Sequence, residues 1–442
     1  MYFHYEIPEA FQWFPESRYG MFIHWGPYAA LERGEQVLFR EHLNQREYEL
    51  AACKWNPKGY DAREWVKIMK EGGFRYACLT TRHHDGYCLW DSKYTNYTSM
   101  KQAPGRDFVR EYVDAMHEAG LKVGFYYSWC DFRIPAYYEG PEKNPEGYQR
   151  MKEYIHGQVE ELCTKYGKID YFFFDGVWPR CAKDLDSPGL VAKMRKWQPG
   201  IMINNRLGYS TDPEQLLRHG GGFEEGDFGT PEHLVNPENR LWESNQVSFW
   251  RWWGYHGGER HKTAPELLDL LCSCVSKGGN LLINVGPDGD GRFPKETLAS
   301  IKKIGAWMNT CGEALYGNQG GALTDAVTFG YETMKDQNLY LIFRFWRPGQ
   351  PFRLADLINP VEEVTLLNTG EKLPFEKKGE DLWIYNLPDL EEELFPVIRV
   401  ACKGRPETNS WGSQVLWEGD PLRIAQWARD QRGENAEFNV EK

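Results

Sequence analysis

Polar side chains that could hold a small polyhydroxylated ligand follow the ends of several short apolar runs in this 442-residue chain. Histidine, tyrosine, aspartate, tryptophan and arginine offer hydrogen-bonding groups and flat apolar faces, a combination that suits a monosaccharide. At the ends of five runs stand His24, His83 and His84, Tyr127, Asp175 with Trp178, and Arg206. If these runs are parallel strands of a barrel, their carboxyl ends meet at the face where such barrels hold their active sites. The pattern therefore predicts a sugar pocket at that face.

Asp175 is the strongest candidate for a catalytic residue in this set. It ends the run YFFFD and is followed by Gly176, which places one carboxylate at the mouth of a buried strand. The alternative is an aspartate that caps the next helix or closes a turn. Retaining glycosidases use two carboxyl groups roughly 5 to 5.5 Å apart, one as nucleophile and one as acid/base. A second carboxyl group must therefore come from elsewhere in the chain.

Candidates for the second carboxyl group lie in the irregular stretch after the fifth run: Glu224, Glu225, Asp227, Glu232 and Glu243. A long loop over the mouth of a barrel can carry such a group onto the substrate. Glu224 and Glu225 are more simply interpreted as a solvated acidic pair. The residues alone leave the choice among the others open.

The sequence offers weaker evidence for a metal or cofactor site than for a pair of catalytic carboxyl groups. His83, His84 and Asp85 are common ligand types, but neighbouring residues of a strand point in opposite directions, so both imidazoles do not easily bind one ion. The stretch GPDGDGRFP resembles a calcium loop until Arg292 takes the place of a ligand. Neither a dinucleotide-binding glycine loop nor a nucleophile elbow appears. We therefore expect no metal and no cofactor, and keep a metal-dependent hydrolase as an alternative.

The composition disfavours some classes of binding partner. A formal charge of −12 and a pI near 5.5 disfavour nucleic acid and anionic membranes. No segment reaches the roughly 20 apolar residues of a membrane span, and the N-terminal residues do not resemble a signal peptide. The ten cysteines are scattered, several of them inside apolar runs, which is typical of buried thiols in a reducing compartment. These features predict a cytoplasmic protein.

Alternation of strands and helices predicts the fold that positions these residues. Nearly continuous apolar runs, typical of buried parallel strands, lie at 20–25, 74–80, 121–128, 169–175, 200–205 and 279–285. Amphipathic helices are expected at 61–73, 107–120, 148–166, 264–277 and 294–312. We predict an α/β fold with an irregular (β/α)8-like, TIM-type barrel over residues 1–315. Short strand-like runs with turn residues predict a C-terminal antiparallel β-sandwich over 316–442.

Seven segments of the chain resemble glycoside hydrolase family 29, the α-L-fucosidases: RYGMFIHWGPYA, YACLTTRHHDGYCLWDSKYTNYT, VGFYYS, FFFDGVW, INNR, GDFGTPEH and VSKGGNLLINVGPDGDG. They run in the family's order from about residue 18 to 292. The resemblance implies an exo-acting hydrolase that removes terminal α-L-fucosyl groups from glycans or glycosides by a retaining double displacement, without a cofactor.

The same resemblance implies roles for individual residues. Asp175 matches the nucleophile; His24, His83 and His84 match histidines that hold sugar hydroxyls; Tyr127 matches a tyrosine near the nucleophile; Arg206 matches a pocket arginine; and Glu35 matches a sugar-binding glutamate. Glu232 best matches the acid/base, with Glu243 as the second choice. Some relatives carry tryptophan where this chain has Gln36 and Phe173. Phe173, Trp178 and the WRWWGY cluster at 250–255 are candidates for packing the fucose methyl group or the leaving group.

A second class of function is a catalytically silent fucose-binding protein, which would keep His24 and Arg206 without needing two carboxyl groups. Hydrolysis is favoured because candidates for both carboxyl groups are present. The aromatic-rich second half suggests a homo-oligomer. Linkage preference, natural substrate, transglycosylation and oligomeric state are not determined by the sequence.

Overall fold

The protein is described by a computed structural model that covers residues 6–209, 226–318, 320–321, 323, 327–390 and 394–408. It divides into two compact units, the first of which ends at Asn318. The predicted boundary after residue 315 falls just before that point.

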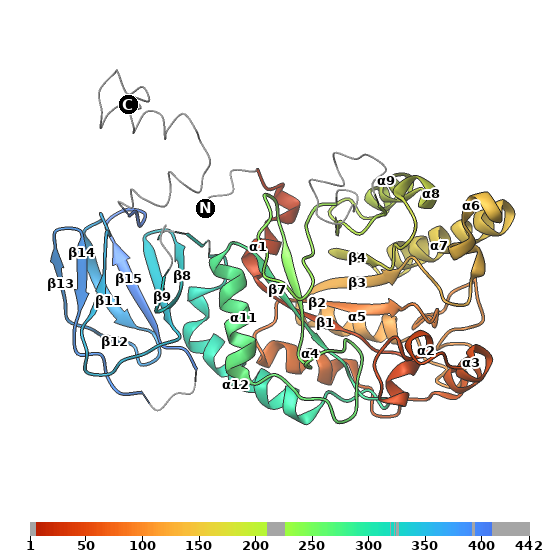
Figure 1. Cartoon of the computed structure of the whole chain (residues 1–442), viewed down its shortest axis with the longest axis horizontal. Coiled ribbons are helices and arrows are strands. Elements are labelled where there is room, and N and C mark those ends of the chain that lie inside the picture. The colour runs from red at the N-terminus through yellow and green to blue at the C-terminus, as the bar shows by residue number, and fades with distance from the viewer. Residues whose placement is uncertain are drawn as a thin grey trace, which may run out of the picture. The chain divides into compact units, whose positions relative to one another are not determined.

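The first unit is built on a curled parallel sheet (Figure 1). Its seven strands lie in the order β5-β4-β3-β2-β1-β7-β6. Their bounds are β1 Tyr19–Ile23, β2 Tyr76–Arg82, β3 Lys122–Ser128, β4 Tyr171–Asp175, β5 Met202–Ile203, β6 Glu243–Val247 and β7 Asn280–Val285. The six runs found in the sequence all contain strands of this sheet. The predicted irregular barrel is therefore confirmed.

The sheet edges formed by β5 and β6 are linked by the stretch 226–233. On one side, Asp227 N of this stretch donates a hydrogen bond to Ile203 O of β5 at 2.7 Å. On the other side, Asn245 N of β6 donates to Pro231 O of the stretch at 2.9 Å. Isolated parallel bridges join Asn204 to Phe228 and Glu232 to Asn245. This irregular strip occupies the gap between the two edge strands and satisfies their backbone groups.

Helices surround the parallel sheet (Figure 1). Their bounds are α1 Trp13–Ser17, α2 Val37–Arg40, α3 Gln45–Lys54, α4 Ala62–Glu71, α5 Phe108–Ala119, α6 Pro135–Lys143, α7 Pro145–Lys165, α8 Ala182–Leu185, α9 Ser187–Trp197, α11 Ala264–Ser276 and α12 Lys295–Cys311, with 3-10 turns at Glu9–Phe11, Pro27–Leu31 and Gly312–Ala314. Asp61 caps α4 by accepting hydrogen bonds from Arg63 N and Glu64 N. Gly120 ends α5 with a φ of 72°, which glycine adopts without strain. No helix among the described residues is long and apolar enough to cross a membrane.

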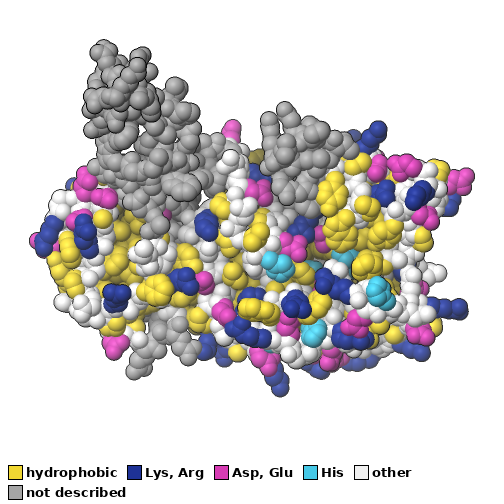
Figure 2. All heavy atoms as spheres, in the orientation of Figure 1, with side chains coloured by type: hydrophobic (Ala, Val, Ile, Leu, Met, Phe, Trp, Pro, Cys, Tyr) yellow, Lys and Arg dark blue, Asp and Glu magenta, His cyan; other side chains and the backbone are white. Residues whose placement is uncertain are grey.

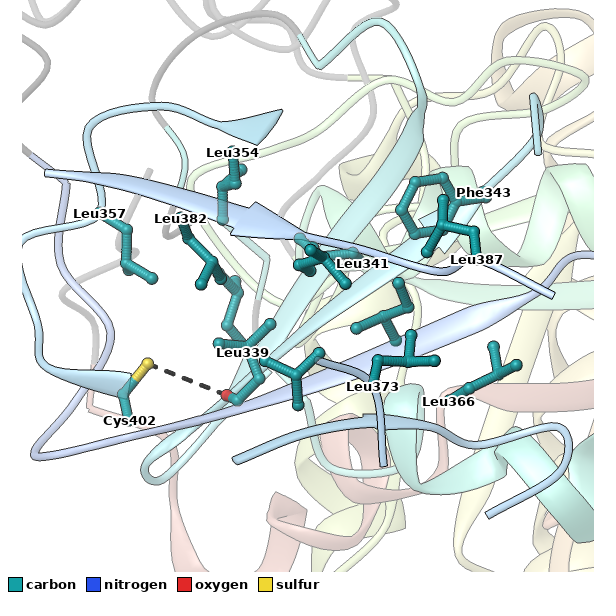
Figure 3. Packing of buried hydrophobic residues seen from close by; sticks show 14 of the residues in the cluster. Leu339, Leu341, Phe343, Leu354, Leu357, Leu366, Leu373, Leu382, Leu387 and Cys402 are labelled. Carbon is teal, nitrogen blue, oxygen red and sulfur yellow. Dashed lines mark hydrogen bonds between the residues drawn. The ribbon is translucent and has the colours of Figure 1, made fainter. Parts of the chain in front are cut away.

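The second unit consists of two antiparallel sheets, in keeping with the predicted sandwich. One sheet has the order β12-β11-β15-β9-β8 and the other β10-β14-β13. The bounds are β8 Gly330–Lys335, β9 Asn338–Phe343, β10 Phe352–Leu354, β11 Val361–Leu366, β12 Glu371–Lys372, β13 Phe375–Lys378, β14 Asp381–Ile384 and β15 Val397–Cys402. Side chains from both sheets, such as Leu339, Leu366 and Leu382, share one buried core (Figure 3).

Charged side chains of both signs are intermixed over the face of the molecule in Figure 2. All ten cysteines are free, and eight of them are buried. Burial raises the pKa of several of these thiols, Cys78 and Cys272 among them. They are therefore packing residues of the two cores rather than cross-links.

Candidate active site

A cavity of about 560 Å³ lies at the carboxyl ends of the parallel strands. Its walls carry most of the predicted site residues: His24, Glu35, His83, His84, Phe173, Asp175, Trp178, Arg206 and Glu232. Phe22, Tyr126 and Phe173 line it and also belong to the buried core beneath it, so it is closed on that side. A second cavity, of about 930 Å³, lies beside α4 and the start of α12 and contains none of these residues.

Asp175 is the last residue of β4 and opens into the cavity. Arg206 Nη1 donates to its Oδ1 at 2.7 Å, and the Tyr126 hydroxyl donates to its Oδ2 at 3.0 Å. His84 Nε2 lies 3.9 Å from Oδ2. Burial alone would raise the pKa of Asp175, but the Arg206 guanidinium and the His84 imidazole hold it below its usual range. Asp175 is therefore an ionised carboxylate at neutral pH.

Arg206 joins the two carboxylates. While its Nη1 holds Asp175, its Nη2 donates to Glu232 Oε2 at 2.8 Å. Its Nε donates to Thr230 Oγ1 at 3.1 Å, and its guanidinium carbon lies 5.1 Å from the centre of the Phe173 ring. A guanidinium is planar and rigid, so carboxylates held by its two terminal nitrogens must be close neighbours.

His24 presents an unprotonated nitrogen to the cavity. Its Nδ1 lies 2.6 Å from Asn284 Oδ1, and Asn284 Nδ2 donates to the Trp253 carbonyl oxygen at 2.6 Å. Because a carbonyl oxygen can only accept, the amide of Asn284 has one orientation, and His24 Nδ1 must be the donor. Burial lowers the pKa of His24 to about 3. The neutral ring therefore has a free acceptor at Nε2.

His84 has the same tautomer for a related reason. The Ser128 hydroxyl donates to the Cys130 carbonyl oxygen at 2.8 Å, so it accepts from His84 Nδ1 at 2.6 Å. Burial lowers the pKa of His84 to about 4, although Asp175 opposes this shift. The pKa of His83 is also well below its usual value because the ring is buried. Its Nδ1 has no partner among the described residues. Three neutral imidazoles thus line the cavity together with Asp175.

Glu35 and Trp253 also line the cavity. Glu35 is buried and accepts hydrogen bonds from Trp253 N at 3.1 Å and Gly254 N at 2.9 Å. Burial raises its pKa, an effect that these backbone donors partly offset. The Trp253 ring lies 5.2 Å from His24 and 5.1 Å from His233. The sequence indicated an aromatic cluster at 250–255 but not which member lines the cavity.

Two predicted residues point elsewhere, and both predictions were wrong in position. Tyr127 faces away from the cavity, because alternate residues of β3 point to opposite sides, and its hydroxyl donates to Gln158 of α7 at 2.8 Å. Tyr126 takes the predicted place beside Asp175. Glu243 stands at the amino-terminal end of β6, fully buried in the barrel, where it accepts from the Tyr76 hydroxyl at 2.7 Å and from the Tyr171 hydroxyl. It does not line the cavity.

The other acidic candidates have structural roles or fall outside the described residues. Asp227 accepts from Ile203 N and from Arg195, both at 2.7 Å, and so ties the irregular strip to β5. Glu224 and Glu225 lie outside the described residues. Trp178 stands at the mouth of the cavity with 42% of its surface exposed, next to the His84 ring. Within the described ranges, no three His, Cys, Asp or Glu side chains are grouped so as to hold a metal ion.

The arrangement defines a class of protein. A parallel barrel with the neighbouring carboxyl groups of Asp175 and Glu232 at one end, in a cavity that is also lined by neutral imidazoles and by Arg206, has the groups of a two-carboxylate glycoside hydrolase.

The comparisons with known proteins agree and name the family. The α-L-fucosidase family profile matches residues 5–313, and the chain belongs to this family, glycoside hydrolase family 29. It is similar to human plasma α-L-fucosidase, with 26% identity over 415 residues that cover 87% of each chain.

Solved structures are similar as well. α-L-Fucosidase isoenzyme 1 from Paenibacillus thiaminolyticus is 36% identical with a TM-score of 0.80, and the match covers 89% of this chain and 99% of that one. An enzyme from Bacteroides thetaiotaomicron, solved as a covalent intermediate with 2-fluoro-fucosyl fluoride, is 29% identical with a TM-score of 0.81 over 90% and 97% of the chains.

Proposed function

We propose that this chain is a retaining, exo-acting α-L-fucosidase in which Asp175 is the nucleophile and Glu232 the acid/base. Family membership supports the activity. One observation supports the roles: Arg206 holds both carboxylates side by side in a cavity closed at its floor. A closed floor admits the end of a glycan but not its middle, so a terminal sugar is the expected substrate.

In the first step Asp175 attacks the anomeric carbon of the fucosyl group. The bond from that carbon to the leaving oxygen breaks as Glu232 gives this oxygen a proton, and a fucosyl ester of Asp175 forms. Asp175 loses its charge in this ester. Glu232 has given up its proton and is now a carboxylate. That form can take a proton from water, whose oxygen attacks the anomeric carbon and releases fucose and the free Asp175 carboxylate.

The histidines are suited to bind the sugar. The free Nε2 acceptors of His24 and His84 can each take a hydrogen bond from a sugar hydroxyl, and Glu35 offers carboxyl oxygens across the cavity. Phe173 and Trp253 provide apolar surface for the methyl group or the ring. Contacts of this kind accelerate the reaction if they tighten as charge develops at the anomeric carbon.

Hydrolysis of 4-nitrophenyl α-L-fucoside by the wild type and by Asp175→Ala tests the proposal. We expect the substitution to lower kcat by more than about a thousandfold, and proton NMR of the wild-type reaction to detect α-L-fucose as the first product. Full activity in Asp175→Ala would contradict the nucleophile assignment. Loss of wild-type turnover in excess EDTA would favour a metal-dependent hydrolase, and fucose binding without any turnover would favour a binding protein.

The natural substrate and the cellular setting are further parts of the proposal. We infer a fucosylated oligosaccharide or glycoside as substrate, to be tested with a panel of α-1,2-, α-1,3-, α-1,4- and α-1,6-fucosylated glycans read by fucose release. The ten free thiols support a reducing, cytoplasmic location. A homo-oligomer stays a prediction, and light scattering of the purified chain measures it.

A further inference from the structure

Asn245 lies at the floor of the catalytic cavity with an unused carboxamide. The residue belongs to β6, lines the cavity and has 0% of its surface exposed. Neither its Oδ1 nor its Nδ2 has a hydrogen-bond partner within the described part of the chain. Buried polar groups are nearly always paired, and an unpaired one needs an explanation.

Two other buried asparagines of the barrel use both ends of their side chains. Asn204 accepts from Phe174 N at 2.8 Å and donates to Phe174 O at 2.9 Å. Asn284 contacts His24 and the Trp253 carbonyl, both at 2.6 Å. The barrel therefore can satisfy an internal asparagine with its own groups, but at Asn245 it does not. Because Asn245 lines the cavity, a ligand bound there is the candidate partner for its carboxamide.

The backbone places Asn245 next to the proposed acid/base. Asn245 N donates to Pro231 O and His233 N donates to Asn245 O, both at 2.9 Å, so Asn245 and Glu232 are directly paired. Paired residues of neighbouring strands have their side chains on the same face. Depth separates the two: the Glu232 side chain is 40% exposed, whereas Asn245 is fully buried. Asn245 is therefore the more deeply buried of the two side chains that line the cavity at this pair.

We propose that the Asn245 carboxamide hydrogen-bonds a ring hydroxyl of the fucosyl group bound in this cavity and thereby selects for sugars that carry this hydroxyl. The proposal rests on the proposed function. A carboxamide has an acceptor and two donors, so it can bond a hydroxyl in either direction. A site that pairs its buried polar groups with a substrate hydroxyl rejects analogues that lack this hydroxyl, since the groups then stay unpaired.

The test compares the wild type with Asn245→Leu, which has a similar volume and no polar atoms. The substrates are 4-nitrophenyl α-L-fucoside and its 2-deoxy, 3-deoxy and 4-deoxy counterparts. We expect Asn245→Leu to lower kcat/KM for the parent about ten- to hundredfold. For the one counterpart that lacks the contacted hydroxyl, wild type and variant should have equal kcat/KM. Gln246→Leu is the control, because this neighbouring buried amide donates to Ser244 Oγ and does not line the cavity.

A purely structural role predicts a different pattern. An equal loss with all four substrates, or no loss with the parent, would overturn the proposal. The melting temperature of Asn245→Leu should match or exceed that of the wild type, because two unpaired buried groups are removed. If Asn245→Leu does not fold, Asn245→Ser provides the same comparison with a smaller side chain.

Calorimetric titration with L-fucose separates this inference from the proposed function. If the wild type binds fucose without hydrolysing any fucoside, the proposed function fails. Weaker fucose binding in Asn245→Leu but not in Gln246→Leu would still support the contact. Equal affinities in all three proteins would refute it.

Discussion

Replacing Glu243 by glutamine should stabilise the protein increasingly as the pH rises and leave catalysis intact. Glu243 is fully buried, and the hydroxyls of Tyr76 and Tyr171 are its hydrogen-bond partners. Burial raises its pKa to about 7, although these hydrogen bonds and the charge of Arg206 oppose the shift. Glutamine has the shape of the protonated form but cannot ionise.

The sign and size of the effect follow from linkage. Below pH 4.5 the side chain is protonated in both the folded and the unfolded chain, so it carries no ionisation penalty. Between pH 4.5 and about 7 the unfolded chain ionises while the folded one stays protonated, and the free energy of unfolding falls. At 1.36 kcal/mol per pKa unit, the loss is about 3 kcal/mol at completion. Above pH 7 it grows no further.

The assay is urea unfolding of the wild type and Glu243→Gln at pH 5, 6 and 7, with kcat measured on a fucoside with a poor leaving group. We expect the stability difference, variant minus wild type, to grow by about 2 kcal/mol over this range, with kcat unchanged within about threefold. A constant stability difference would refute the raised pKa. A loss of kcat of more than about a hundredfold, as expected for a lost acid/base, would return that role to Glu243.

Three further predictions concern the site itself. Glu232→Ala should lower kcat at least about a hundredfold on a poor leaving group and much less in the first step on 4-nitrophenyl fucoside; equal losses on both would argue against an acid/base. Asn284→Leu should lower kcat/KM about tenfold through the orientation of His24, and a loss confined to thermal stability would contradict this positioning role. On the acid side of its pH profile, kcat/KM should not depend on a group with a pKa near 6.5. Burial lowers the pKa of His24 to about 3 and that of His84 to about 4, so both rings stay neutral there. A fall in kcat/KM that follows a group with a pKa near 6.5 would refute the neutral state of these two histidines.

Much of the site was predictable because strand ends are visible in a sequence. Asp175, Arg206 and His84 each follow an apolar run, and parallel strands bring such ends together. The tyrosine near Asp175 was predicted as Tyr127, but the residue that contacts Asp175 is its neighbour Tyr126. The two residues are of the same type, and only the orientation of β3 determines which of them faces the cavity.

Strand β6 was not predicted because its sequence, ESNQV, is polar although every residue in it is buried. Hydrophobic patterns cannot reveal a strand whose side chains face a catalytic cavity or a buried polar cluster. For the same reason, Asn245 had no signal in the sequence.

The sequence by itself determined the α/β barrel and the second β domain and brought Asp175, His24, His83 and His84 to one face of the barrel, because these depend on local patterns and strand ends. Only the tertiary structure showed that Glu232 lines the cavity and that Glu243, 11 residues further along the sequence, does not. Glu232 lies on the irregular strip at the cavity mouth, within reach of Arg206, whereas Glu243 begins β6 at the other end of the barrel. Both are glutamates of the same irregular stretch, but their surroundings differ because Glu232 faces the cavity and solvent, whereas Glu243 contacts two tyrosines in the core.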